Sequence, residues 1–310
     1  MKLRNIFIMI GLTIFTACSD NDSEPVVEPV TGPTEVQLIS FNILPIDATH
    51  TGDLDWKQRR KALLNLINTE RPDVMCMQGQ LWNQVVYIEQ QLPDYTMIDH
   101  NADGDDSNRG RHNSIMFRTD KYTLMGEGRY WLSQRPTSAS YPWSSLDEER
   151  RITTWVLLKD NQTKAQFYVA TTLMNDGDES VDHDARLNSA NLNVDKMKTF
   201  LDDQAEKIPL MLDKIPMILT GDMNASYSAD DSRRDCLAPY YDYMTDARTA
   251  ADTDSKPSYN ALGQTVTNGR LQPDIIFLRD AQPLSFRTLD GNYGVSYISD
   301  HFPISCKIKL

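Results

Sequence analysis

The chain has 310 residues, 40% of them hydrophobic, and a formal net charge of −13 at pH 7. This length supports a sizeable core, and the four cysteines imply no disulfide framework. The acidic balance repels polyanions, so the charge argues against a protein that binds nucleic acid tightly.

The first residues have the pattern of an export signal. A basic start and an apolar run of about ten residues precede Phe15-Thr16-Ala17-Cys18, which places small residues before a cysteine. A membrane-spanning helix needs about 20 apolar residues, so the run is too short for a transmembrane anchor. We therefore expect a lipoprotein signal peptide over residues 1–17 and a lipid on Cys18 that anchors the chain in the cell envelope. The acidic start at 19–22 resembles a surface-export signal, which indicates the outer-membrane surface.

An acidic, proline-rich stretch follows the cysteine. Residues 18–34 contain three prolines and no apolar period, which predicts an extended tether. No second composition shift and no internal repeat follows, so residues 35–310 are expected to form one domain. Cys76 and Cys306 lie in apolar runs that indicate buried thiols.

Apolar periodicity then predicts strands and helices in alternation. Residues 36–43 are apolar on both faces, as expected for a strand inside a covered sheet. A helix over 56–68 places Leu63, Leu66 and Ile67 on one stripe, and Asp55 can cap it. Further strands are predicted at 74–77, 113–118, 153–159, 166–173, 217–220, 274–278 and 302–308, with helices at 82–92 and 186–201. This pattern favours two sheets packed face to face with helices outside, and it leaves the strand pairing open.

Eight short motifs follow one another along the chain. They are Ser40-Phe41-Asn42-Ile43, Trp56 with Arg60, Arg71-Pro72-Asp73-Val74, Tyr130-Trp131-Leu132-Ser133, Arg151-Ile152-Thr153-Thr154-Trp155, Gly221-Asp222-Met223-Asn224, Asp274-Ile275-Ile276 and Ser299-Asp300-His301-Phe302-Pro303. In this order they resemble the endonuclease/exonuclease/phosphatase superfamily, from about Val36 to Leu310. The resemblance implies a four-layer α/β sandwich, in which two mixed β-sheets pack face to face and are flanked by helices.

The resemblance also implies a phosphoester hydrolase with its active site on loops at one edge of the sandwich. Attack on a phosphate ester needs a held water and donors for the developing charge. By resemblance, Asp222 would activate or hold the water, and Asn224 would orient it or contact the phosphate. His301 would meet the phosphate, with Asp274 fixing its tautomer.

The cation that the resemblance implies, Mg²⁺ or Mn²⁺, lacks its usual ligand. Asn42 and Asp300 would lie near it, but Met77-Gln78-Gly79 stands where the family has Leu-Gln-Glu, and that Glu is its principal metal ligand. A glycine offers no oxygen donor from its side chain, so the change should weaken cation binding. Leu173 likewise replaces the histidine of the family.

Two arginines near the expected site offer another source of positive charge. Arg111 replaces a family glutamate, and a guanidinium can grip phosphate oxygens in a fork. Arg111 and Arg151 are therefore the candidate substrate-binding residues. Alternatively, Asp103, Asp105 and Asp106 could bring a relocated cation, although such acidic loops are usually solvated turns.

Three functions remain open at this point. The first is a metal-dependent phosphoesterase with an altered ligand set, acting on a small, lipid-linked or glycan-linked phosphate ester. The second is a non-catalytic binding module for a glycan or other envelope ligand, motivated by aromatic clusters at 130–131, 141–143 and 240–243. The third, a secreted nuclease, is disfavoured by the net charge. The retained Asp222 and His301 favour the hydrolase.

Overall fold

A computed structural model describes most of the chain beyond its N-terminal segment. The described residues are 32–104, 107–143, 149–177, 180–207, 215–226, 228, 231–249, 253–254, 256–266 and 271–310. The predicted signal peptide, Cys18 with its expected lipid, most of the predicted tether, Asp105 and Asp106 lie outside them. Within these ranges, no helix is both long enough and apolar enough to cross a membrane.

Two six-stranded sheets form the centre of the molecule. The strands are β1 (Glu35–Asn42), β2 (Val74–Gln80), β3 (Tyr95–Asn101), β4 (His112–Arg118), β5 (Tyr122–Trp131), β6 (Ile152–Asp160), β7 (Gln166–Leu173), β8 (Met217–Asp222), β9 (Thr245–Asp246), β10 (Asp274–Arg279), β11 (Gln282–Thr288) and β12 (Ile304–Lys309). One sheet has the order β11-β12-β1-β2-β4-β3, and the other β5-β6-β7-β8-β10-β9. Both sheets are mixed, because β1 pairs in parallel with β2 and β7 with β8, whereas the other pairs are antiparallel.

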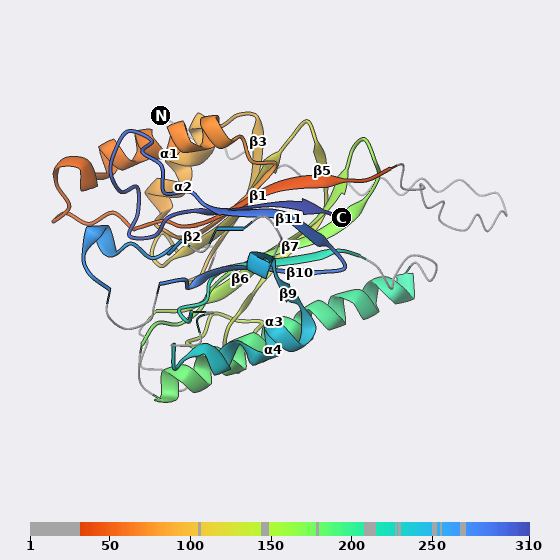
Figure 1. Ribbon diagram of the computed structural model, residues 1–310. Coiled ribbons are helices and arrows are strands. Elements are labelled where there is room, and N and C mark those ends of the chain that lie inside the picture. Colours follow the sequence, from red (N-terminus) through yellow and green to blue (C-terminus); the bar gives the residue numbers. More distant parts are fainter. Residues whose placement is uncertain are drawn as a thin grey trace, which may run out of the picture.

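Helices cover the outer face of each sheet. They are α1 (Trp56–Glu70), α2 (Trp82–Gln91), α3 (Ser180–Lys207) and α4 (Ala238–Tyr243), with short 3₁₀ turns at Gly52–Leu54, Arg234–Leu237, Ala247–Thr249 and Ala261–Gly263. In Figure 1, α1 and α2 lie over the sheet that contains β1, and α3 and α4 lie over the sheet that contains β10. The architecture is therefore the four-layer α/β sandwich that the resemblance implied.

The first helix illustrates how the sequence determines an element. Asp55 caps α1, since its carboxylate accepts a hydrogen bond from the Lys57 backbone N–H at 2.7 Å. Leu63, Leu66 and Ile67 are buried against the sheet, as the helical stripe predicted. The helix ends at Arg71, whose left-handed backbone (φ 45°) turns the chain into β2.

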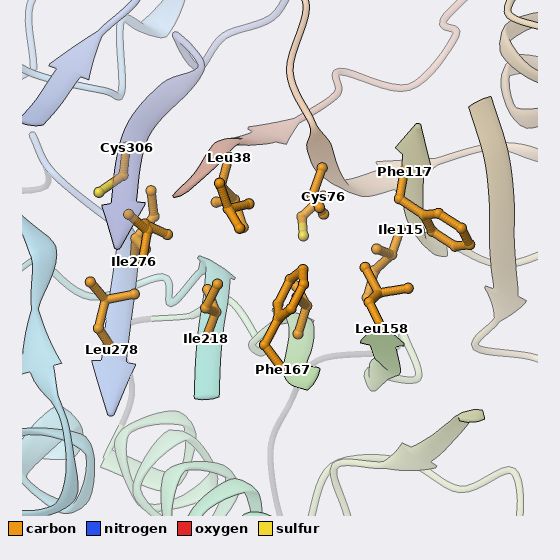
Figure 2. Packing of buried hydrophobic residues seen from close by; sticks show 14 of the residues in the cluster. Leu38, Cys76, Ile115, Phe117, Leu158, Phe167, Ile218, Ile276, Leu278 and Cys306 are labelled. Atoms are coloured by element: carbon orange, nitrogen blue, oxygen red, sulfur yellow. The ribbon is translucent and has the colours of Figure 1, made fainter. Parts of the chain in front are cut away.

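The inner faces of the two sheets pack against each other in an apolar layer (Figure 2). Leu38 and Cys76 of one sheet face Phe167 and Ile218 of the other, and all four side chains are fully buried. Cys306 lies in the same layer, so both thiols predicted to be buried are buried. Apolar contacts between the sheets thus form the central core.

The layer between the sheets becomes polar toward one end, which we call the polar end. Along the inward-facing rows, Ser40 and Asn42 follow Leu38 in β1, Gln78 follows Cys76 in β2, Thr171 follows Val169 in β7, and Thr220 and Asp222 follow Ile218 in β8. Gln78 Nε2 donates hydrogen bonds to Ser40 Oγ (3.1 Å) and, across the two sheets, to Thr171 Oγ1 (2.7 Å). Buried polar groups need such partners.

Candidate active site

A cavity of about 350 Å³ opens at the polar end of the inter-sheet layer. Seven of the eight candidate site residues line it: Asn42, Arg111, Arg151, Asp222, Asn224, Asp300 and His301. They come from strand ends and loops of both sheets. Asp274 does not line the cavity and lies behind His301.

Asp222, the last residue of β8, is held by donors from both sheets. Its Oδ2 accepts a hydrogen bond from Asn42 Nδ2 at 2.8 Å, and its Oδ1 accepts one from the Asn224 backbone N–H at 2.8 Å. The neighbouring Gly221 has φ +143°, and a β-carbon there would lie 1.8 Å from the Thr172 carbonyl oxygen. Only glycine permits this close approach of β7 and β8, so Gly221 helps to place the carboxylate.

Asn224 follows Asp222 in a left-handed turn. Its φ of 47° is a conformation that asparagine adopts more readily than most residues. The side-chain Nδ2 donates to the Met174 carbonyl oxygen at 2.8 Å, which ties the turn to the loop after β7. Asn224 lines the cavity with its amide nitrogen already bonded, so its amide oxygen is the atom left to meet a ligand.

His301 is buried and lies between two carboxylates. Its Nδ1 is 2.8 Å from Asp274 Oδ2, and its Nε2 is 3.8 Å from Asp222 Oδ2. Ser258 Oγ donates to the same Asp274 oxygen at 2.6 Å and fixes it in place. Burial by itself lowers the pKa of His301, but Asp274 and Asp222 outweigh burial and raise it to about 10. The imidazole is therefore positively charged at neutral pH.

The same surroundings also shift the pKa of the Asp222 carboxyl. Burial raises the pKa of Asp222, Asp274 raises it further, and the His301 charge works against both. A carboxylate with a raised pKa is a better proton acceptor than an ordinary aspartate. The pair therefore places a base and a charged donor side by side in one cavity.

An ion-pair cluster that the sequence analysis missed lines the cavity as well. Arg111 Nε and Nη2 both lie 2.9 Å from Glu149 Oε1, and Arg151 Nη2 lies 3.3 Å from Glu149 Oε2. The sequence analysis named the two arginines as candidate substrate-binding residues, but it did not name Glu149. Only its place directly before Arg150-Arg151 could have drawn attention to it.

The backbone at Gly79 explains the departure from the metal-ligand motif. Gly79 lies at a β-bulge between Gln78 and Gln80 with φ +79°, and a β-carbon there would lie 2.8 Å from Asn42 Oδ1. A glutamate at this position would therefore be strained in its backbone and would require the Asn42 side chain to move. The Gly79 carbonyl oxygen accepts a long hydrogen bond, 3.4 Å, from Arg111 Nη1.

The described residues do not fit the cation that the resemblance implies. Asp222, Asp274 and His301 offer ligand atoms that all lie within 4.8 Å of one another. In this arrangement Asp222 Oδ2 accepts from Asn42 and His301 Nδ1 is bonded to Asp274 Oδ2, so these atoms are engaged with protein groups. Asp300 Oδ1 accepts from Ser299 Oγ at 3.1 Å. Of the acidic loop, Asp103 pairs with Arg150 at 2.8 Å, whereas Asp105 and Asp106 lie outside the described residues.

One arginine of the quoted motifs, Arg60, does not line the cavity. Arg60, quoted with Trp56, stacks on Tyr87, with its guanidinium 4.5 Å from the ring centre. It is Arg59 that is fully buried, and it donates hydrogen bonds to the carbonyl oxygens of Leu44, Pro45 and Ile298. Arg59 thus holds together two loops beside Asp300. Arg59 lies four residues before Leu63, on the apolar stripe of the helix, and this spacing was the signal that could have identified it.

The aromatic clusters that motivated a binding module are in part buried, with Trp143, Tyr241 and Tyr243 half-buried. Tyr130, Trp131 and Tyr240 are buried, and Tyr130 Oη donates to Asn193 at 2.7 Å. Buried rings cannot stack on a glycan. Tyr141 is exposed, and the Arg150 guanidinium lies 4.4 Å from its ring centre.

Comparison with known proteins identifies the family. A sequence model described as the Endonuclease/Exonuclease/phosphatase family matches residues 39–301. The fold is similar to family proteins from Bacteroides thetaiotaomicron (23% identity, TM-score 0.76, 90% of this chain and 99% of that one) and Bacteroides vulgatus (24%, 0.75, 89% and 99%). It is also similar to a Bacteroides thetaiotaomicron mannosyl-6-phosphatase (23%, 0.74, 88% and 99%). A search of curated proteins gave no match. Since the family model spans most of the sequence and the sandwich agrees with it, the chain belongs to the endonuclease/exonuclease/phosphatase family.

Proposed function

We propose that this chain is a phosphoester hydrolase that acts on a small phosphate ester at the cell envelope. The observation that carries the proposal is the pairing of Asp222 with a positively charged His301, 3.8 Å apart, in one cavity. Family membership and phosphatase-like structural neighbours support a phosphoesterase-type function.

In the proposed reaction, Asp222 holds the water and accepts its proton as the water oxygen bonds to phosphorus. The ester P–O bond then breaks, and the proton on His301 Nε2 passes to the leaving oxygen. This division matches the raised pKa of the Asp222 carboxyl and the charged state of the imidazole. Asp274 stabilises the imidazolium, while Asn42 and Asn224 hold the carboxylate in place.

No step of the proposed reaction passes through a divalent cation, because the donor set at the cavity does not fit one. The positive charges that face the cavity come from Arg111, Arg151 and His301. Positioned cationic donors of this kind stabilise the charge that develops on phosphoryl oxygens. The hydrolase is therefore proposed with a changed ligand set instead of the metal dependence that the resemblance implied.

The proposed substrate is a phosphate ester of a sugar or another small molecule, free or linked to a glycan or lipid. One of the similar structures is a mannosyl-6-phosphatase, which supports a small phosphomonoester. A cavity of about 350 Å³ is within the range of small-molecule sites. The net charge of −13 argues against nucleic acid. A lipid on Cys18 would anchor the enzyme beside envelope substrates.

The test is phosphate release from a panel of sugar phosphates and other phosphomonoesters by the full-length chain. Asp222→Asn should lower kcat/KM by about 10²- to 10⁴-fold, the usual contribution of a general base. Asp290→Asn is a matched control, because Asp290 pairs with Lys256 on the surface away from the cavity, and its activity should stay within about twofold of wild type. The proposal would be contradicted if Asp222→Asn left phosphate release unchanged. It would also be contradicted if the wild type released phosphate from none of the esters.

A further inference from the structure

The cavity wall carries one carboxylate shared by two arginines. Arg111 Nε donates a hydrogen bond to Glu149 Oε1 at 2.9 Å, and Arg111 Nη2 forms an ion pair with the same oxygen at 2.9 Å, while Arg151 Nη2 lies 3.3 Å from Oε2. The two oxygens of one anion thus bridge two guanidinium groups. A phosphate group offers the same arrangement of oxygens with a larger negative charge.

The three side chains differ in how firmly they are held. Glu149 is the most exposed, at 41%, whereas the Arg111 and Arg151 side chains are 26% and 8% exposed. The next residue, Arg150, is fixed by Asp103 and lies over the Tyr141 ring. Of the three side chains, Glu149 therefore has the most contact with solvent. Ion pairs as exposed as this one are weak, so a dianion can compete with it.

The position of Arg111 adds a second argument. Its Nη1 lies against the Gly79 carbonyl oxygen, where the β-bulge leaves no room for a side chain. The guanidinium thus lies in the cavity wall beside Gly79, the position at which the family has its cation-binding glutamate. Positive charge is present there without a metal ion, and Arg111 supplies it.

We infer that Arg111 and Arg151 form a metal-independent phosphate-binding site, in which Glu149 is an internal anion that the incoming phosphate group displaces. This inference rests on the proposed function only in that the phosphate belongs to the ester to be hydrolysed. The binding itself requires no reaction, so inorganic phosphate is a sufficient probe.

The experiment is calorimetric titration of inorganic phosphate into the full-length chain in buffer with EDTA. Wild type should bind phosphate, and Arg111→Gln should weaken binding by about 10-fold or more, the value of a charge-assisted pair. Glu149→Gln should tighten binding by about two- to fivefold, because it removes the competing charge of a weak ion pair. Addition of Mg²⁺ should leave all these affinities unchanged.

Arg118 provides the matched control. It lies at the other end of β4 from Arg111, pairs with Asp120 at 2.6 Å, and does not line the cavity. Arg118→Gln should leave phosphate affinity within about twofold. Equal weakening by Arg111→Gln and Arg118→Gln would mean that overall charge alone attracts phosphate, and it would overturn the inference. Binding that requires Mg²⁺, or weaker binding by Glu149→Gln, would also overturn it.

The failure of this inference is distinguishable from failure of the proposed function. If phosphate binds through Arg111 while no ester is hydrolysed, the binding site stands and the hydrolase does not. If Asp222→Asn abolishes hydrolysis while Arg111→Gln leaves phosphate affinity unchanged, the hydrolase stands and the arginine site is wrong. A thermal melt of each variant confirms that it is folded before titration.

Discussion

The two ends of the layer between the sheets use the same strands in opposite ways. At the apolar end, Leu38 and Ile218 face each other with no polar partner, whereas two and four residues further along the same rows Ser40, Thr220 and Asp222 replace them. The strand register therefore decides which residues become core and which become site. A sandwich of this kind obtains a polar cavity by changing residue type along continuous strands, without a separate binding domain.

The largest effect is expected from a substitution at the apolar end. Phe167→Ala removes a fully buried ring that packs edge-on against Tyr122, with the two ring centroids 5.4 Å apart. The substitution should lower the free energy of unfolding by about 3–5 kcal/mol. Urea unfolding measures the change. Hydrolysis per folded molecule should not change, because Phe167 lies away from the cavity lining. A selective loss of kcat would contradict the separation of the two ends.

A smaller effect on stability, but a larger one on activity, is expected at the polar end. Gln78→Met keeps the volume and removes the donors to Ser40 and Thr171, which should lower the free energy of unfolding by about 1–3 kcal/mol. Because Gln78 pairs in register with Asn42, phosphate release should fall as well. Gln91→Met on the exposed end of α2 is the control. Unchanged activity in Gln78→Met would show that the polar layer does not position the site.

A pH dependence of stability is expected from His301, and its change per pH unit is the smallest of these effects. The folded protein holds its proton up to a pKa of about 10, whereas the unfolded chain releases it near the ordinary value of 6.5. The stabilisation is therefore complete below pH 6.5 and is lost as the pH rises toward 10, at most about 1.4 kcal/mol per pH unit.

His301→Gln tests this pH dependence. Unfolding should be measured from pH 6.5 to 7.5 with EDTA present, about one unit below the ordinary cysteine pKa of about 8.5. The free energy of unfolding of wild type should fall across this range, and that of the variant should stay level. Parallel curves for the two proteins would assign the proton to another group.

The strands that could be predicted from the sequence are those inside the sheets. Residues such as 36–43 and 166–173 are apolar on both faces because helices cover one side and the second sheet covers the other. The strands β3, β5, β9 and β11 were not predicted, and they are the outermost strands of the two sheets. In β5, exposed Thr123 and Glu127 and two glycines interrupt the apolar residues, so no continuous apolar run marks the strand.

The candidate site divides in a similar way. Residues inside ordered motifs, such as Asp222 and His301, could be placed together because the resemblance fixes their positions relative to the strands. Glu149 belongs to no motif, and its pairing with Arg111 spans 38 positions of the chain. The backbone conformation at Gly79 could not be predicted either, because a glycine in a sequence does not by itself reveal a left-handed bulge.

That bulge constrains how this site can evolve. A single codon change to glutamate at position 79 would place a β-carbon against Asn42 on a backbone that disfavours any side chain. The new carboxylate would also meet Arg111, which already lies at the same carbonyl oxygen. A substitution to glutamate alone would therefore meet backbone strain and an arginine at the position where the family binds its cation.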